Sequence, residues 1–171
     1  MMMKKSQTLF VSMMTAALFM SSAPNVYAGS PCEGSSNMTA EQQHVLPVTE
    51  ADGHILMLSQ DSGPMKSVGM IGNGTATDRG MNRLFQGNGE GQGYHTLKTD
   101  EGTVVVQWLG TVKTTLKDNR PNTTFEGNWE IIKGSGKFQD SKGQGSYNGY
   151  FTSETTRVVN WKGTCSLAAT K

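Results

Sequence analysis

The sequence is poor in cysteine and in clustered charge, and it lacks a long apolar run. Two cysteines occur in 171 residues without a CxxC pair, so the common zinc and dithiol redox motifs are excluded. Lysine plus arginine number 15 and aspartate plus glutamate 14, scattered along the chain, so no basic face for a nucleic acid is expected. The longest apolar stretch, 9–20, is shorter than the roughly 20 residues that a membrane-spanning helix needs.

That apolar stretch has the features of a cleavable export signal. Lys4 and Lys5 precede it, and Val26-Tyr27-Ala28 supplies the small residues that signal peptidase prefers before a cut at Gly29. The alternative is an uncleaved anchor or a core helix. The pattern favours a signal peptide over 1–28, a periplasmic or secreted protein, and no stable membrane span after cleavage.

The two cysteines both belong to the expected mature chain. Cys32 and Cys165 lie near its two ends, and in an oxidising compartment such a pair most simply forms a disulfide. Lipid attachment at Cys32 is the rival interpretation, and Pro31 argues against it because that reaction needs a small residue before the cysteine. We therefore predict a Cys32–Cys165 bridge.

Helical periodicity is also missing from the mature chain. Residues 29–43 are small and polar, which predicts a flexible arm held only by the disulfide, followed by a single domain over 44–171. Turn motifs at 61–64, 72–74 and 100–102 divide that domain into short runs rich in β-branched residues. The expected strands are 54–60, 65–71, one within 83–99, 103–116, 123–132, 143–153 and 155–163.

Alternation within these runs gives each strand one apolar face and one polar face, as in an antiparallel sheet with a single core. Glycines recur at every second residue over 87–93, and again at 134 and 136 and at 143 and 145. A strip without side chains lets a strand coil sharply or lets another backbone approach closely, and this favours strand over a flexible loop for 87–93. The fold class predicted is all-β, a small antiparallel closed barrel of about eight strands.

Motifs that would identify chemistry are incomplete. The histidines His44, His54 and His95 have no metal-ligand spacing, and Gly134-Ser135-Gly136-Lys137 lacks the first glycine and the final Ser or Thr of a phosphate loop. We assign no catalytic residue, no metal and no cofactor. Strand aromatics are the candidate ligand-binding residues, with core filling as the alternative role: Tyr94, Trp108, Phe125, Trp129, Tyr147 and Trp161.

The stretch 93–164 resembles the allene oxide cyclase barrel-like group, which includes the dirigent-like proteins. The likeness rests on glycine and aromatic spacings: Gly93-Tyr94, the turn 100–102, the runs 106–110 and 125–131, Gly134-Ser135-Gly136-Lys137-Phe138 and 142–147. The resemblance implies an eight-stranded antiparallel barrel with a central cavity, often in dimers or trimers. Its members either steer a reactive intermediate or have no known activity, and none of their catalytic positions matches a residue here.

Three functions are consistent with these observations. The first is a non-catalytic binding module for a small apolar or amphipathic ligand or an envelope partner. The second is a cyclase- or dirigent-like protein that restrains a reactive intermediate, which needs an inward polar anchor such as Glu130 or Asn128. The third is a structural or interaction protein with a solid barrel. The lack of a catalytic constellation favours the first.

Overall fold

The computed structural model describes residues 29–48 and 52–167, and this part of the chain forms strands and turns without a helix. The signal peptide predicted for 1–28 lies outside the described residues. The strands, in chain order, are β1 (Ser30–Pro47), β2 (His54–Gly69), β3 (Gly74–Phe85), β4 (Asn88–Thr99), β5 (Gly102–Lys117), β6 (Arg120–Gly136), β7 (Lys142–Phe151) and β8 (Thr156–Ser166).

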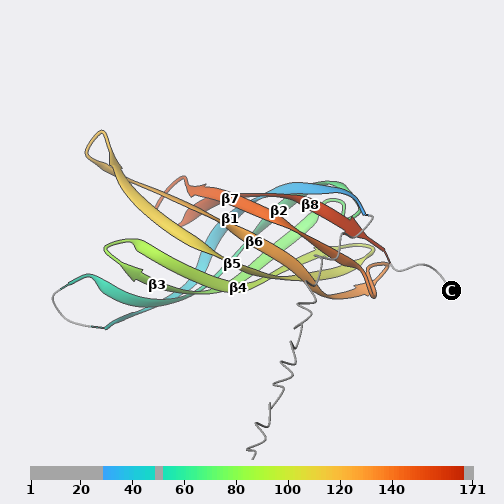
Figure 1. Cartoon of the computed structure of the whole chain (residues 1–171), viewed down its shortest axis with the longest axis horizontal. Coiled ribbons are helices and arrows are strands. Elements are labelled where there is room, and N and C mark those ends of the chain that lie inside the picture. Colours follow the sequence, from blue (N-terminus) through green and yellow to red (C-terminus); the bar gives the residue numbers. More distant parts are fainter. Residues whose placement is uncertain (1–28, 49–51, 168–171) are drawn as a thin grey trace, which may run out of the picture.

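The eight strands form one closed antiparallel barrel in which each strand pairs with its neighbours in sequence (Figure 1). The barrel closes where β1 pairs with β8, with Ser30 opposite Cys165 and Thr39 opposite Thr156. Because every strand has two partners, the sheet has no free edge. The predicted fold class is confirmed. The prediction of a strand for the glycine run 87–93 is confirmed as well, because β4 begins at Asn88.

Two local predictions are wrong. The segment 29–43 is not a flexible arm: most of it is β1, which is bonded on both sides to β2 and β8. Its inward positions include Ser36 and Met38, both buried, so small polar residues share a strand with core residues. Likewise 61–64 is not a turn but the middle of β2, where Gly63 allows the carbonyl of Asn37 to approach closely.

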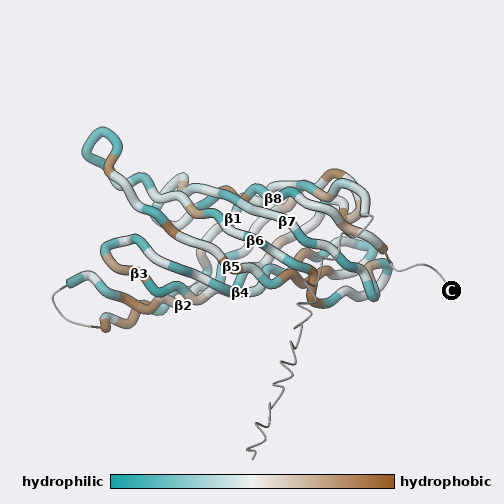
Figure 2. Tube along the Cα trace, in the orientation of Figure 1, coloured by the Kyte–Doolittle hydropathy of each residue, from teal (hydrophilic) through white to brown (hydrophobic). Residues whose placement is uncertain are grey.

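The two ends of the barrel differ. One end, here the closed end, carries the β2–β3, β4–β5 and β6–β7 connections, and buried side chains such as Ile71, Val104 and Phe138 fill it. The other end, here the mouth, carries the β1–β2, β3–β4, β5–β6 and β7–β8 hairpins, which spread apart in Figure 1. Figure 2 shows apolar segments on the β1–β2 hairpin, where Leu46 is 60 % exposed.

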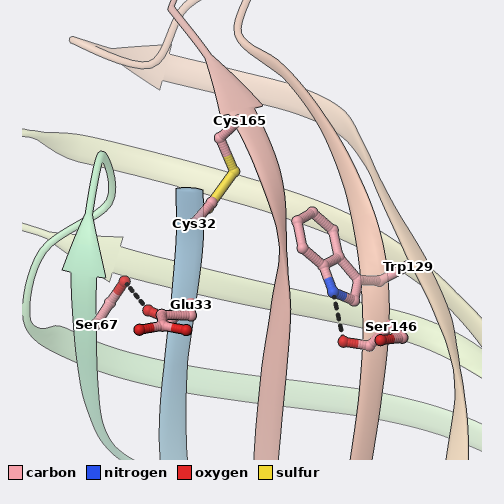
Figure 3. Close-up of a disulfide and its surroundings, with 6 residues drawn as sticks. All are labelled: Cys32, Glu33, Ser67, Trp129, Ser146 and Cys165. Atoms are coloured by element: carbon pink, nitrogen blue, oxygen red, sulfur yellow. Dashed lines mark hydrogen bonds between the residues drawn. A yellow bond between two sulfur atoms is a disulfide. The ribbon is translucent and has the colours of Figure 1, made fainter. Parts of the chain in front are cut away.

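The predicted disulfide is present at the closed end. Cys32 of β1 and Cys165 of β8 are bonded, with their Cα atoms 5.5 Å apart, and both residues are buried (Figure 3). Nearby, Trp129 Nε1 donates a hydrogen bond of 3.1 Å to the carbonyl oxygen of Ser146 on β7. The bridge therefore fastens the strand pair that closes the barrel, beside the most densely filled part of its interior.

Candidate functional site

The barrel interior contains a chamber of about 240 Å³ that extends from its middle toward the mouth. Its walls come from β2 through β8, and its side chains are mostly apolar. Near the mouth the wall includes Leu84, Val112 and Phe151, while Ile71 and Leu97 lie toward the closed end. The interior is thus packed at one end only.

Five of the six aromatic residues predicted to bind a ligand line this chamber: Trp108, Phe125, Trp129, Tyr147 and Trp161. Tyr147 lies between two of them, with its ring centroid 6.0 Å from that of Trp108 in an edge-to-face arrangement and 6.4 Å from that of Phe125. Tyr94 is the exception and its assignment to the chamber is wrong. Its neighbours Gly93 and His95 face inward, so alternation along β4 places Tyr94 on the outer face, half exposed.

Glycines make room for the largest of these rings. A Cβ added to Gly80 of β3 or to Gly93 of β4 would lie 2.8 Å from Cζ2 of Trp108. Both glycines face the interior, where the indole crosses them. The alternate glycines of β4 therefore provide the space in which the Trp108 side chain lies across the barrel.

A cluster of polar and charged side chains lies at mid-height in the barrel interior, and we call it the polar cluster; Asp78, His95 and Arg157 line the chamber, whereas Asp61 does not. At its centre Arg157 of β8 donates from a single nitrogen, Nη2, to Asp61 Oδ2 at 2.6 Å and to Asp78 Oδ2 at 2.7 Å. Asp61 on β2 is 4 % exposed and Asp78 on β3 is 3 % exposed. Buried carboxylates are costly unless paired, so the guanidinium is what allows both to occupy the interior.

The other oxygen of Asp78 organises two further chamber residues. Oδ1 accepts a hydrogen bond of 2.7 Å from Trp108 Nε1, and it lies 3.1 Å from Nδ1 of His95 on β4. Because Nδ1 faces a carboxylate oxygen, it carries the proton of this hydrogen bond, and Asp78 fixes the orientation of the imidazole ring. Asp78 thus orients the largest aromatic ring and one histidine of the chamber at the same time.

Burial and pairing shift the pKa values of Asp61 and Asp78 in opposite directions. Burial raises the pKa of Asp61, and the charge of Arg157 offsets this only in part. Burial alone would also raise the pKa of Asp78, but the hydrogen bond from His95 and the charge of Arg157 together lower it below the ordinary value. Asp78 is therefore the firmly ionised member of the cluster, and Asp61 is the more easily protonated one.

Three buried polar atoms of the chamber residues have no hydrogen-bond partner: His95 Nε2, Arg157 Nε and Trp161 Nε1. Native proteins leave few buried polar groups unpaired, and such groups mark places where a ligand or water supplies the partner. The tilted ring of Trp161 lies next to that of His95, with centroids 6.4 Å apart. The chamber therefore combines an apolar wall with unused hydrogen-bonding capacity.

Sequence reasoning missed the polar cluster. The cyclase- or dirigent-like function would need Glu130 or Asn128 turned inward, but both lie exposed on the outer face of β6, so neither is an inward anchor. Alternation along β3 could have indicated that Asp78 faces the interior, because it lies between the inward positions Ala76 and Gly80. Three strand or turn carboxylates are exposed to solvent: Glu126, Glu130 and Glu154.

Two further observations concern residues 29–48 and 52–167. No group of three or more His, Cys, Asp or Glu side chains among them is arranged to hold a metal ion. Nor does this part of the chain contain a helix long and apolar enough to cross a bilayer.

Comparison with known proteins adds no relative. No protein-family model matches the chain, and no curated protein matches it at a significant level.

Proposed function

We propose that this protein is an exported binding protein that holds a small amphipathic molecule inside its barrel. The observation that carries the proposal is the chamber itself, which has an aromatic wall and a polar cluster with unpartnered atoms at mid-height. Ligand sites are typically concave and apolar, with a few fixed polar groups that orient the ligand. The apolar part of the ligand would lie toward the mouth, and its polar part would meet the cluster.

Several features support binding over a solid structural barrel. A structural barrel has no need of a central void, because voids in a core cost stability. A buried ion-pair cluster is likewise weak as a stabilising device compared with apolar packing. The volume of about 240 Å³ favours a small ligand, although a longer chain could extend through the mouth.

Export is supported by the N-terminal signal pattern together with the disulfide. Cys32 and Cys165 are bonded and buried, and such structural bridges persist in oxidising compartments such as the periplasm or the cell exterior. Periplasmic or secreted location is therefore part of the proposal.

A blocking variant with a matched control tests the binding proposal. Val112 lines the chamber on β5, whereas its neighbour Lys113 faces solvent. We expect Val112→Phe to abolish uptake of the apolar fluorescent probe N-phenylnaphthylamine and Lys113→Phe to leave uptake unchanged. Native mass spectrometry of the protein purified from its own host would identify a retained molecule. A folded wild-type protein that takes up no probe, or equal uptake by both variants, would contradict the proposal.

Control of a reactive intermediate, as in the cyclase- and dirigent-like group, is a second candidate. The observation that favours it is His95, whose Nδ1 lies against Asp78 and whose Nε2 is buried without a partner in a side chain that lines the chamber, within reach of a ligand for proton transfer. Chemical conversion of a ligand that is recovered with the protein, lost in His95→Gln while binding persists, would support this candidate over simple binding.

A further inference from the structure

We propose that the chamber binds an uncharged alcohol, whose hydroxyl group is held between the side chains of Asn82 and Tyr147. This inference rests on the proposed binding function and specifies the polar group of the ligand. It is drawn from the position of the two side chains, from their unused hydrogen-bonding groups and from their neutral state.

Asn82 and Tyr147 lie at the two ends of one row of directly paired positions that crosses the inner face of the sheet. From β3 to β7 the row consists of Asn82, Gly91, Gly110, Gly127 and Tyr147. Three consecutive strands thus carry no side chain between the two polar residues, and we call these three positions the glycine floor. Both polar residues line the chamber.

The two polar side chains approach each other over the glycine floor. Asn82 Oδ1 lies where a Cβ atom of Gly91 would be, and the hydroxyl of Tyr147 lies against the corresponding place at Gly110. Because Gly91 and Gly110 are direct partners, these places are about one strand spacing apart, roughly 4.8 Å. A single ligand oxygen with two hydrogen bonds of about 2.8 Å can bridge such a separation.

Neither polar group has a hydrogen-bond partner within residues 29–48 and 52–167. Asn82 is only 6 % exposed, yet its side-chain amide forms no hydrogen bond there, and the hydroxyl of Tyr147 forms none either. Buried polar side chains in native proteins are almost always paired, and a buried tyrosine hydroxyl usually finds a partner. The two groups therefore offer an acceptor and a donor to a molecule inside the chamber.

Both groups are uncharged, and this selects the class of ligand. The amide does not ionise, and burial raises the pKa of Tyr147, so its phenol is neutral at physiological pH. A hydroxyl group matches the pair because it donates to Asn82 Oδ1 and accepts from Tyr147. An ionised head group would instead leave water for a place that holds no opposite charge, which is costly.

The charges of the neighbouring polar cluster are already engaged with one another. The lowered pKa of Asp78 keeps it ionised against Arg157, so no unopposed positive charge remains to attract a carboxylate. Asp61 is bonded to the same guanidinium and does not line the chamber, so it is not presented to an ammonium group. The unpartnered atoms Arg157 Nε and Trp161 Nε1 are donors, which an ammonium group cannot satisfy.

Apolar surface surrounds the proposed hydroxyl position. A Cβ atom added to Gly91 would lie 3.2 Å from Cζ3 of Trp108, whose ring also meets that of Tyr147 edge to face. Leu84 and Val112 continue the wall toward the mouth. The hydrocarbon part of the alcohol would contact these side chains while its hydroxyl group remains at the glycine floor.

Two isomers, 1-octanol and heptyl methyl ether, test the inference because they contain the same atoms and differ in whether the oxygen carries a proton. An apolar chamber alone favours the ether, which is the less polar isomer. The Asn82 acceptor favours the alcohol, because the ether has no proton to donate. We expect titration calorimetry at neutral pH to show octanol binding about tenfold tighter than the ether, and about tenfold or more tighter than octylamine and octanoate. This ranking is measured on the wild-type protein and does not depend on the folding of a variant.

Two variants assign the preference to the two side chains. Asn82→Leu removes the acceptor that only the alcohol can use, so the preference for octanol over the ether should disappear. Tyr147→Phe removes a donor that both isomers can use and should weaken both about tenfold. The matched controls are Asn128→Leu and Tyr94→Phe, which make comparable changes on the outer face of the barrel and should alter neither affinity. Circular dichroism of each variant confirms that it is folded.

The outcomes separate this inference from the proposed function. The alcohol would be overturned if the wild-type protein bound the ether as tightly as octanol, bound octanoate or octylamine most tightly, or took up N-phenylnaphthylamine but no octanol. A preference for octanol that persisted in folded Asn82→Leu would overturn it as well. In each of these cases uptake of N-phenylnaphthylamine by the wild-type protein would leave the binding function standing. If neither the alkyl probes nor N-phenylnaphthylamine enter the folded protein, the binding function itself falls.

Discussion

Replacing Arg157 by methionine should expose how much the barrel depends on its buried charges. The variant keeps an apolar chain beside Phe125 and removes two hydrogen bonds, of 2.6 and 2.7 Å, to Asp61 and Asp78. Hydrogen bonds to charged groups contribute about 1.5–3 kcal/mol each, so two of them predict a loss of about 3–6 kcal/mol. Removing one partner of a buried pair typically costs about 3–5 kcal/mol, which agrees. Urea denaturation at neutral pH measures the change in the free energy of unfolding.

The free energy of unfolding of Arg157→Met should also depend on pH in a specific way. Without the guanidinium, burial should raise the pKa of Asp61 further above its unfolded value, so the folded state binds a proton there more readily. The stability contributed by that proton is present at low pH and is lost as the pH rises through the folded pKa of Asp61. The deficit of Arg157→Met should therefore shrink in mild acid.

A compensated variant completes the test. Adding Asp61→Asn and Asp78→Asn to Arg157→Met removes the uncompensated charges and should recover much of the lost stability, because an uncharged interior no longer needs the pair. A loss below about 1 kcal/mol for Arg157→Met, or an equal deficit at neutral and acidic pH, would refute the reasoning, since the arginine would then not be holding two buried carboxylates.

Three other predictions follow from the packing and the charges. Replacing both Cys32 and Cys165 by alanine should lower the free energy of unfolding by about 2–5 kcal/mol in urea titrations, and probe uptake at the mouth of the folded variant should persist. Gly80→Ala places a methyl group 2.8 Å from the ring of Trp108, which is its nearest neighbour there, and should destabilise the protein by about 1–3 kcal/mol; an unchanged urea midpoint would contradict that packing. Burial alone would raise the pKa of Asp78, but its partners hold it below the ordinary 3.8, so this carboxylate stabilises the fold above that pH, and the contribution is lost as the pH falls through the lowered pKa. The stability difference between wild type and Asp78→Asn, measured from neutral pH into acid, should shrink over that range.

Strand alternation made the barrel predictable because it is a local property. Val104 and Val106 on one strand, and Trp129 and Ile131 on another, are buried on the faces that alternation assigned to them. It failed for β1, because a strand bonded on both sides needs few apolar side chains of its own. Ser36 and Met38 occupy adjacent inward positions there, and the composition of the segment resembles a linker.

The polar cluster could not be predicted because its pairs are distant in sequence. Arg157 and Asp61 are 96 residues apart, and no local pattern joins them. Tyr94 was misassigned for a related reason: an aromatic residue in a strand is apolar enough for either face. Only the inward positions of its neighbours Gly93 and His95, which the cross-strand partners determine, exclude it from the chamber.

The disulfide lies at the junction that must form last as the barrel assembles. Every other pairing joins strands that follow one another in the chain, so each can form as a hairpin soon after it is synthesised or translocated. The thiols of Cys32 and Cys165, 133 positions apart, meet only when the eighth strand reaches the first. Oxidation can therefore act only after the barrel has closed, and chains whose last strand has not paired with the first would keep two free thiols that a thiol reagent could detect.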